Sequence, residues 1–161
     1  MEKTRILSAL DRAIQAEREA HAFYTKAAGE TDDPGGAEMF RELAAFERHH
    51  EEHLKGLKAS LESQAGWIHY PGRKIAKVPA AAEAQGRKAA GSHANALDAL
   101  RIAIGAEERA ITEYRTLAAE APDARGQDMF RKLAEEEELH RKLLDDQYYA
   151  LTNRGVWIWG D

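Results

Sequence analysis

The chain of 161 residues contains no cysteine. It therefore forms no disulfide bond, performs no thiol catalysis, and cannot bind zinc or an iron–sulfur cluster through cysteine thiolates. A lack of cysteine is typical of proteins that work in a reducing compartment, so we expect a cytoplasmic protein.

Proline, long apolar runs and excess positive charge are also scarce. Only 4 prolines interrupt the chain, which permits long helices. No run approaches the roughly 18 apolar residues of a membrane span, and the N-terminal stretch MEKTRILSALDRA is charged rather than signal-like. The formal net charge of −5 disfavours nucleic acid as a partner. We expect a single domain over residues 1–161, with no membrane and no nucleic-acid contact.

What the chain does contain is an internal repeat. When the sequence is shifted by 90 residues, MFRELAAFERHH (residues 39–50) aligns with MFRKLAEEEELH (residues 129–140). Over residues 7–69, 24 of 63 positions are identical, including glutamate, tyrosine and tryptophan pairs that a shared helical composition does not explain. We infer two halves, about residues 4–69 and 94–159, that arose by duplication.

Each half predicts two helices. Apolar residues recur at helical spacing, and the stretches TDDPGG and APDARG break the pattern in the middle of each half. Asp33 can cap the second helix, Pro34 suits its first turn, and Ser92 is a candidate cap for the third helix. The expected helices cover about residues 4–29, about 34–63, about 92–120, and from the APDARG turn to about 151.

A segment of nearly thirty residues, about 64–91, joins the two halves. A connection of this length can cross the whole length of a bundle, so the second and third helices can run parallel. It can also hold a short helix near residues 80–88. We interpret the segment as a solvated crossover. The alternative is a docking patch for an acidic partner, because the segment contains five basic residues: Arg73, Lys74, Lys77, Arg87 and Lys88. The predicted fold is all-α, a four-helix bundle built from two duplicated helical hairpins.

Four glutamates and two histidines occupy matched positions of the repeat. Glu47 and His50 are three residues apart and share one face of a helix. Leu43 and Leu54 lie one turn away from them, so that face is otherwise apolar. A buried carboxylate without a partner is very costly. The six matched residues are Glu17, Glu47, His50, Glu107, Glu137 and His140.

Two divalent cations would remove this cost, because their four positive charges balance the four carboxylates. Di-iron and di-manganese carboxylate bundles have this ligand pattern: two helices each supply one glutamate, and the other two helices each supply a Glu-x-x-His motif. A ligand set of nitrogen and oxygen accepts iron, manganese or zinc. A metal-free bundle with salt-bridged core networks is the alternative.

The chain resembles the rubrerythrin family of the ferritin-like superfamily. The resemblance is carried by AEREAHAFY and AFERHHEEH in the first half and by AEERAITEY and EEEELH in the second. It implies a ferritin-like bundle with two iron ions at the six matched residues, where the metals do the chemistry, and Tyr24 and Tyr114 hydrogen-bonded to ligand carboxylates across the core. It also implies an oxidoreductase that reacts with hydrogen peroxide or dioxygen, of peroxidase or ferroxidase type, and a homodimer.

Two departures from the family pattern matter. The cysteine-rich rubredoxin segment is missing, so any electron donor must be a separate protein. Typical members also carry a further glutamate one turn after the ligand of the third helix, where this chain has Ala110 and, at the repeat position, Ala20. We expect the missing glutamate to impair peroxidase action more than ferroxidase action or iron binding. One alternative function is iron binding or sequestration without efficient turnover. Another is dimanganese catalase-like chemistry, because the same ligand set accepts manganese.

Other residues near the motifs have weaker functional interpretations. His21 lies on the ligand face, as either an extra ligand or a structural histidine, while His49 and His53 have no histidine at the repeat position and are not expected to be ligands. We expect the tryptophans to cap the bundle ends or to lie in a subunit interface: Trp67, Trp157 and Trp159. We expect core packing from Met39, Phe40, Met129 and Phe130.

Overall fold

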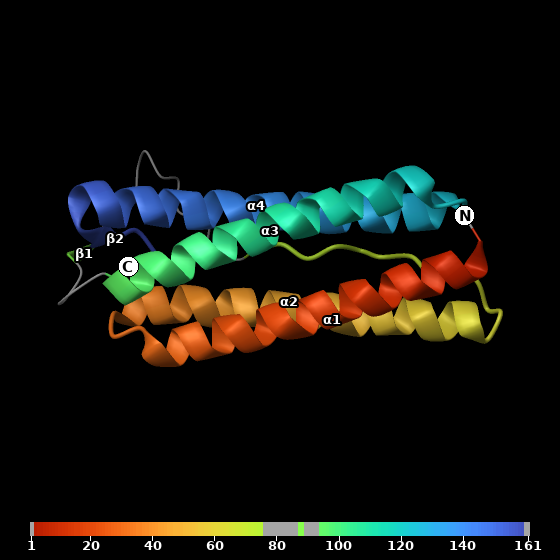
Figure 1. Cartoon of the computed structure of the whole chain (residues 1–161), viewed down its shortest axis with the longest axis horizontal. Helices are drawn as coiled ribbons and strands as arrows, with labels where there is room; N and C mark the ends of the chain where they lie inside the picture. Colours follow the sequence, from red (N-terminus) through yellow and green to blue (C-terminus); the bar gives the residue numbers. More distant parts are fainter. Residues whose placement is uncertain (1, 76–86, 89–93, 160–161) are drawn as a thin grey trace.

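The computed structural model describes residues 2–75, 87–88 and 94–159, and within them it contains four long helices (Figure 1). These are α1 (Lys3–Glu30), α2 (Pro34–Glu62), α3 (Ala94–Glu120) and α4 (Ala124–Arg154). Helix α1 pairs closely with α2, and α3 with α4, so each half of the repeat is one helical hairpin. The predicted all-α, ferritin-like four-helix bundle is confirmed.

The ends of the helices follow from local capping chemistry. The Asp33 carboxylate accepts a hydrogen bond of 3.0 Å from the backbone N–H of Gly36, and Pro34 occupies the first turn of α2, as predicted. Asp123 caps α4 in the same way, accepting from the N–H of Arg125 at 2.8 Å. Gly155, with φ of 63°, ends α4 in the left-handed conformation that favours glycine. The predicted cap Ser92 lies outside the described residues.

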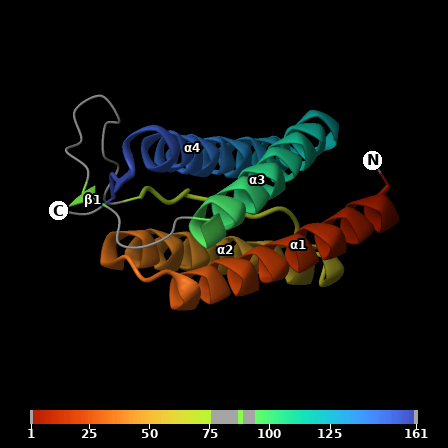
Figure 2. The same cartoon turned by 60° about the vertical axis from the view of Figure 1, so that its left-hand side comes forward.

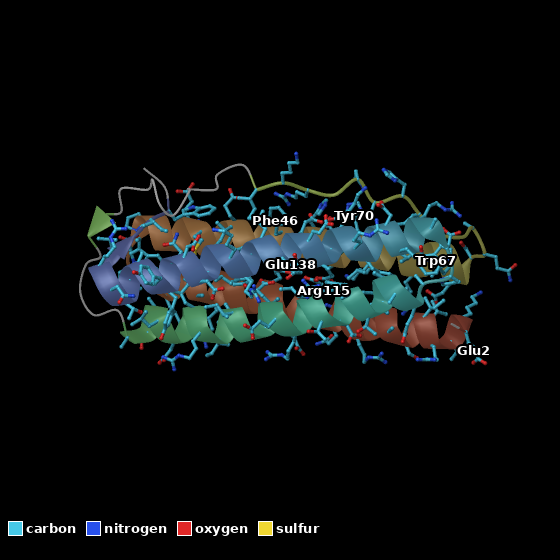
Figure 3. All side chains as sticks on the ribbon, turned by 90° about the horizontal axis from the view of Figure 1, so that it is seen from above. Glu2, Phe46, Trp67, Tyr70, Arg115 and Glu138 are labelled. Atoms are coloured by element: carbon cyan, nitrogen blue, oxygen red, sulfur yellow. The ribbon has the colours of Figure 1, made fainter. Side chains whose placement is uncertain are left out.

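Helices α2 and α3 run in the same direction, since α2 ends and α3 begins at opposite ends of the bundle (Figures 1 and 2). The first part of the segment that joins them, residues 64–75, lies along α2 and α4, on the side opposite α1 and α3 (Figure 3). We call residues 64–75 the crossover segment.

The described part of the expected crossover is solvated along much of its length, but two of its side chains pack into the bundle. Tyr70 is fully buried and Ile75 is 7% exposed. The Lys132 ammonium donates to the Tyr70 carbonyl at 3.0 Å, and the Arg73 guanidinium donates to the Ala45 carbonyl at 3.3 Å. The segment therefore closes the groove between α2 and α4, where these two side chains gain apolar burial.

The predicted helix near residues 80–88 is wrong at its C-terminal end. Arg87 and Lys88 form strand β1 (Arg87–Lys88), which pairs antiparallel with β2 (Val156–Trp157) beyond the end of α4. Backbone pairing with β2 supplies the hydrogen bonds that a helix would have made internally. The rest of that expectation lies outside the described residues.

The repeat is visible in how two tryptophans pack. Trp67, after α2, lies against Gly126 in the first turn of α4, and Trp157, after α4, lies against Gly36 in the first turn of α2. A Cβ atom at Gly126 would come within 2.5 Å of the Trp67 ring, and one at Gly36 within 2.9 Å of the Trp157 ring. Each hairpin thus places a tryptophan over a glycine of the other, near the ends of the bundle, where the tryptophans were expected.

Two apolar clusters form the core, one toward each end of the bundle. One includes Met39 and Phe40, and the other includes Met129 and Phe130, so the predicted core packing of these four is confirmed. Along every helix the buried glutamates and histidines lie between the two clusters. No helix among the described residues is both long and apolar enough to cross a membrane.

Candidate metal centre

The structure brings the six matched residues together in the middle of the bundle. They form two overlapping groups, each with ligand atoms within 4.8 Å of one another: Glu17, Glu47, His50 and Glu137, and Glu47, Glu107, Glu137 and His140. Glu47 and Glu137 belong to both groups. All six side chains are buried, none more than 3% exposed. The arrangement fits a di-metal site in which two shared carboxylates bridge the metal positions.

Both histidines turn the same ring nitrogen toward the carboxylates. His50 Nδ1 lies 2.8 Å from Glu137 Oε1 and 3.4 Å from Glu17 Oε1. His140 Nδ1 lies 3.2 Å from Glu47 Oε1 and 3.7 Å from Glu107 Oε1. We call the first group the His50 position and the second the His140 position.

Each half of the repeat contributes a tyrosine to the other half. The Tyr24 hydroxyl, on α1, donates a hydrogen bond of 2.5 Å to Glu107 on α3, and the Tyr114 hydroxyl, on α3, donates to Glu17 on α1. Tyr24 and Tyr114 are as deeply buried as their partners. The bonds orient one oxygen of each carboxylate and leave the other oxygen for a cation.

The metal-free centre holds protons. Burial and the neighbouring Glu47 charge raise the pKa of Glu17 well above its usual range, and burial and Glu107 do the same to the pKa of Glu137. Burial alone would raise the pKa of Glu47, but hydrogen bonding with Glu17, His140 and His50 lowers it well below its usual range. Burial and mutual charge therefore favour the protonated form of Glu17 and of Glu137, and hydrogen bonding favours the ionised form of Glu47.

The same carboxylates raise the pKa of both histidines. Burial alone would lower these values, but Glu107 and Glu47 raise the pKa of His140 to about 9. For His50, burial is again the largest single influence and would lower the pKa, but the charge of Glu17 and the interactions with Glu136 and Glu137 together raise the pKa well above its usual range. At neutral pH the His140 imidazole is thus protonated without a metal, and a cation that binds there would have to displace its proton.

Several ligand atoms of the centre have no hydrogen-bond partner in the part of the chain that the structure describes, and a pair of cations would supply one. Among the described residues, Glu17 Oε2, Glu107 Oε2 and Glu137 Oε1 are buried without a hydrogen-bond partner. His50 Nδ1 also lacks one, because its 2.8 Å approach to Glu137 Oε1 does not have hydrogen-bond geometry. Unsatisfied buried polar atoms are costly. Their convergence on two points is the arrangement that a hard divalent cation would satisfy.

The other histidines of the first half lie outside these groups. The ring Nδ1 of His21 makes a 2.8 Å hydrogen bond with the Ala44 carbonyl, which makes it a structural histidine. His49 packs against His53, with ring centroids 4.3 Å apart, and His53 packs against Tyr70. His49 and His53 thus pack together beside Tyr70 of the crossover segment, outside the two groups of ligand atoms.

Sequence reasoning missed three residues around the histidines: Phe46, Tyr70 and Glu136. Tyr70 donates to both oxygens of Glu136, at 3.0 and 2.9 Å, and Glu136 Oε1 lies 3.7 Å from His50 Nε2. Phe46 packs edge-on against His140 with ring centroids 4.7 Å apart. Glu136 is one of four consecutive glutamates, so no local signal distinguishes it until the crossover segment is in place.

The centre opens toward one side of the bundle. A cavity of about 530 Å³ lies between α1 and α3, and Glu17, Glu107 and the two shared glutamates line its floor. Its walls are mostly apolar, and they include Ala110 and its repeat equivalent Ala20. Because the crossover segment closes the opposite groove, we infer that small molecules reach the centre between α1 and α3.

Comparison with known proteins agrees with this architecture. A solved structure of a hypothetical protein from Pyrococcus furiosus, Pfu-1136390-001, is similar in fold, with a TM-score of 0.74 and 24% identity over 94% of this chain and 93% of that chain. No curated protein matches the chain. The rubrerythrin family profile matches residues 8–148, which is most of the sequence. The chain therefore belongs to the rubrerythrin family.

Proposed function

We propose that the protein is a non-haem di-iron oxidoreductase that reduces hydrogen peroxide or dioxygen, of peroxidase or ferroxidase type. The carrying observation is the set of buried, unpartnered carboxylate and imidazole atoms that converge on two points. The six residues that would hold the iron ions are Glu17, Glu47, His50, Glu107, Glu137 and His140. A pair of ferrous ions supplies electrons and Lewis acidity to the oxidant when bound.

The residues around the centre have separable roles in this proposal. Tyr24 and Tyr114 fix the orientation of Glu107 and Glu17 and carry hydroxyl protons beside them. The raised pKa of Glu17 and of Glu137 favours two protonated carboxyl groups that can supply protons beside the centre. The apolar cavity between α1 and α3 admits a small oxidant while limiting the access of bulk water.

Turnover would require partners. Reducing equivalents would come from a separate electron-donor protein, because the chain has no cysteine with which to build its own iron–sulfur relay. A homodimer belongs to the proposal through the family relationship. Manganese or zinc would occupy the same ligand set, since hard nitrogen and oxygen donors do not discriminate sharply among these ions.

Ferrous loading under anaerobic conditions, followed by rapid mixing with peroxide or oxygen-saturated buffer, tests the reaction. We expect absorbance changes of iron oxidation within seconds or faster. Oxidation that takes minutes to hours, at a rate no faster than that of a Glu47→Ala variant, would refute catalysis.

A second function, iron binding without efficient turnover, is supported by one observation. Ala110 and Ala20 line the cavity where a further carboxylate would have reached the metals, so in the described residues the ligand set stays at four glutamates. Stable iron loading combined with slow oxidation would favour this role over the first.

A further inference from the structure

The two metal positions are related by the repeat, but their histidines have different surroundings. The carboxylate nearest to His50 Nε2 is that of Glu136. The repeat equivalent of Glu136, 90 residues earlier, is Phe46. The ligand sets therefore match between the halves, while the groups behind the ligands do not. The difference lies on the side of the bundle that the crossover segment covers (Figure 3).

A carboxylate lies behind His50. Its Nδ1 atom faces the ligand carboxylates, so its Nε2 atom points away from the metal position, where Glu136 Oε1 is 3.7 Å distant. The Glu136 carboxylate accepts hydrogen bonds from two residues of the crossover segment, which hold it in place. The Tyr70 hydroxyl donates to it at 2.9 Å, and the backbone N–H of Arg73 donates at 2.9 Å. The Glu136 side chain is 11% exposed, so its charge is only partly screened by solvent.

His140 has no such carboxylate. Its Nδ1 atom also faces the ligand carboxylates. The Nε2 atoms of both histidines lack a hydrogen bond in the described part of the chain, but there only that of His50 has a carboxylate close to it. The nearest ring is Phe46, which meets the imidazole edge-on at 4.7 Å between centroids. The Arg73 guanidinium covers the Phe46 ring, 4.7 Å from its centroid, so a positive group lies on this side.

We propose that Glu136 is a positioning residue that makes the two metal positions unequal, so that the His50 position binds a divalent cation more tightly and fills first. A carboxylate that accepts the outer N–H of a ligand histidine fixes the ring orientation and makes the imidazole a stronger donor, and Glu136 is placed to accept this hydrogen once a cation holds His50 Nδ1. Its negative charge also favours a cation nearby. The His140 position, backed by a phenyl ring and a guanidinium, has neither advantage.

The proposal concerns metal binding and does not depend on any redox step. Titration of the chelator-treated protein with Co²⁺ at neutral pH, followed by visible absorption, measures it. We expect two phases in the wild type. Glu136→Gln should weaken the tighter phase by about 10–100-fold, the usual effect of losing such a partner, and leave the weaker phase unchanged. Tyr70→Phe should weaken the same phase to a smaller extent.

Glu138→Gln is the matched control, because Glu138 lies two residues further along α4 and forms an exposed ion pair with Arg115. It should bind Co²⁺ as the wild type does. Far-UV circular dichroism and thermal unfolding establish that each variant is folded. A Glu136→Gln protein that binds both equivalents like the wild type, or that weakens both phases equally, would overturn the proposal.

The order of filling identifies the position without any variant. In wild-type protein with ¹⁵N-labelled histidine, Zn²⁺ titration should shift the ring resonances of His50 before those of His140. Simultaneous shifts, or His140 first, would overturn the proposal. Binding of no metal would overturn it together with the proposed function, whereas ordered binding with no iron oxidation would leave it standing and remove only the proposed catalysis.

Discussion

Replacement of Gly126 by alanine tests how the two halves fit together. The new Cβ atom would lie 2.5 Å from two atoms of the Trp67 ring and 3.2 Å from a third. Trp67 cannot move away freely, since its ring packs edge-on against Phe130 at 6.3 Å between centroids. Overpacking of this kind costs roughly 1–3 kcal/mol.

Gly56→Ala is the matched control. Gly56 also lies in a helix, but a Cβ atom there would meet nothing within 4 Å. Alanine should stabilise α2 at that position by roughly 0.5–1 kcal/mol. Because both changes replace a helical glycine, the overpacking cost of roughly 1–3 kcal/mol should separate the two variants.

Denaturant unfolding of the chelator-treated proteins measures the difference, with equal slopes against denaturant as a check that the unfolding transition is the same. Combining Gly126→Ala with Trp67→Ala should remove most of the penalty, because the ring that the methyl group meets is gone. A Gly126→Ala protein as stable as Gly56→Ala would refute the packing described between the hairpins.

Three further predictions concern the centre. Glu47→Ala and Glu137→Ala should each abolish binding at both metal positions by equilibrium dialysis, whereas His49→Ala should retain two equivalents; equal loss in His49→Ala would contradict the ligand assignment. Metal loading at neutral pH in weakly buffered solution should release protons, because the pKa values of Glu17 and His50 are raised. An indicator dye measures the release, and a loading that releases no protons would contradict the protonation described for the centre. The folded metal-free protein binds the His140 proton more tightly than the unfolded chain does, because the pKa of His140 is raised to about 9. The resulting stabilisation is complete below pH 6.5 and is lost as the pH rises to about 9, which lowers the free energy of unfolding by about 3 kcal/mol. The His140→Gln variant should show a smaller loss over this pH range.

Most of the fold was predictable because the repeat supplied a second copy of each signal. A lone Glu-x-x-His has little weight on a helix, but Glu47 and His50 recur 90 residues later on an equally apolar face. Helical periodicity then places the four glutamates and two histidines on the inward faces, and the structure brings them together.

The crossover could not be predicted in the same way. Residues 64–75 have basic and polar character without clear periodicity, and their burial depends on a groove that exists only once α2 and α4 are assembled. Glu136 could not be predicted for the same reason, because Tyr70 and Arg73 of the crossover segment hold its carboxylate near His50. Contacts between distant elements, rather than local propensity, determine these features.

The central claim, a two-metal centre built from six residues, is tested most directly by the stoichiometry of anaerobic ferrous loading. Chelator-treated protein is equilibrated with excess Fe²⁺, freed of unbound metal, and analysed for iron per chain. The wild type should retain two equivalents, and Glu47→Ala, which loses a carboxylate common to both positions, should retain almost none. Less than one equivalent in the wild type, or two in Glu47→Ala, would contradict the account.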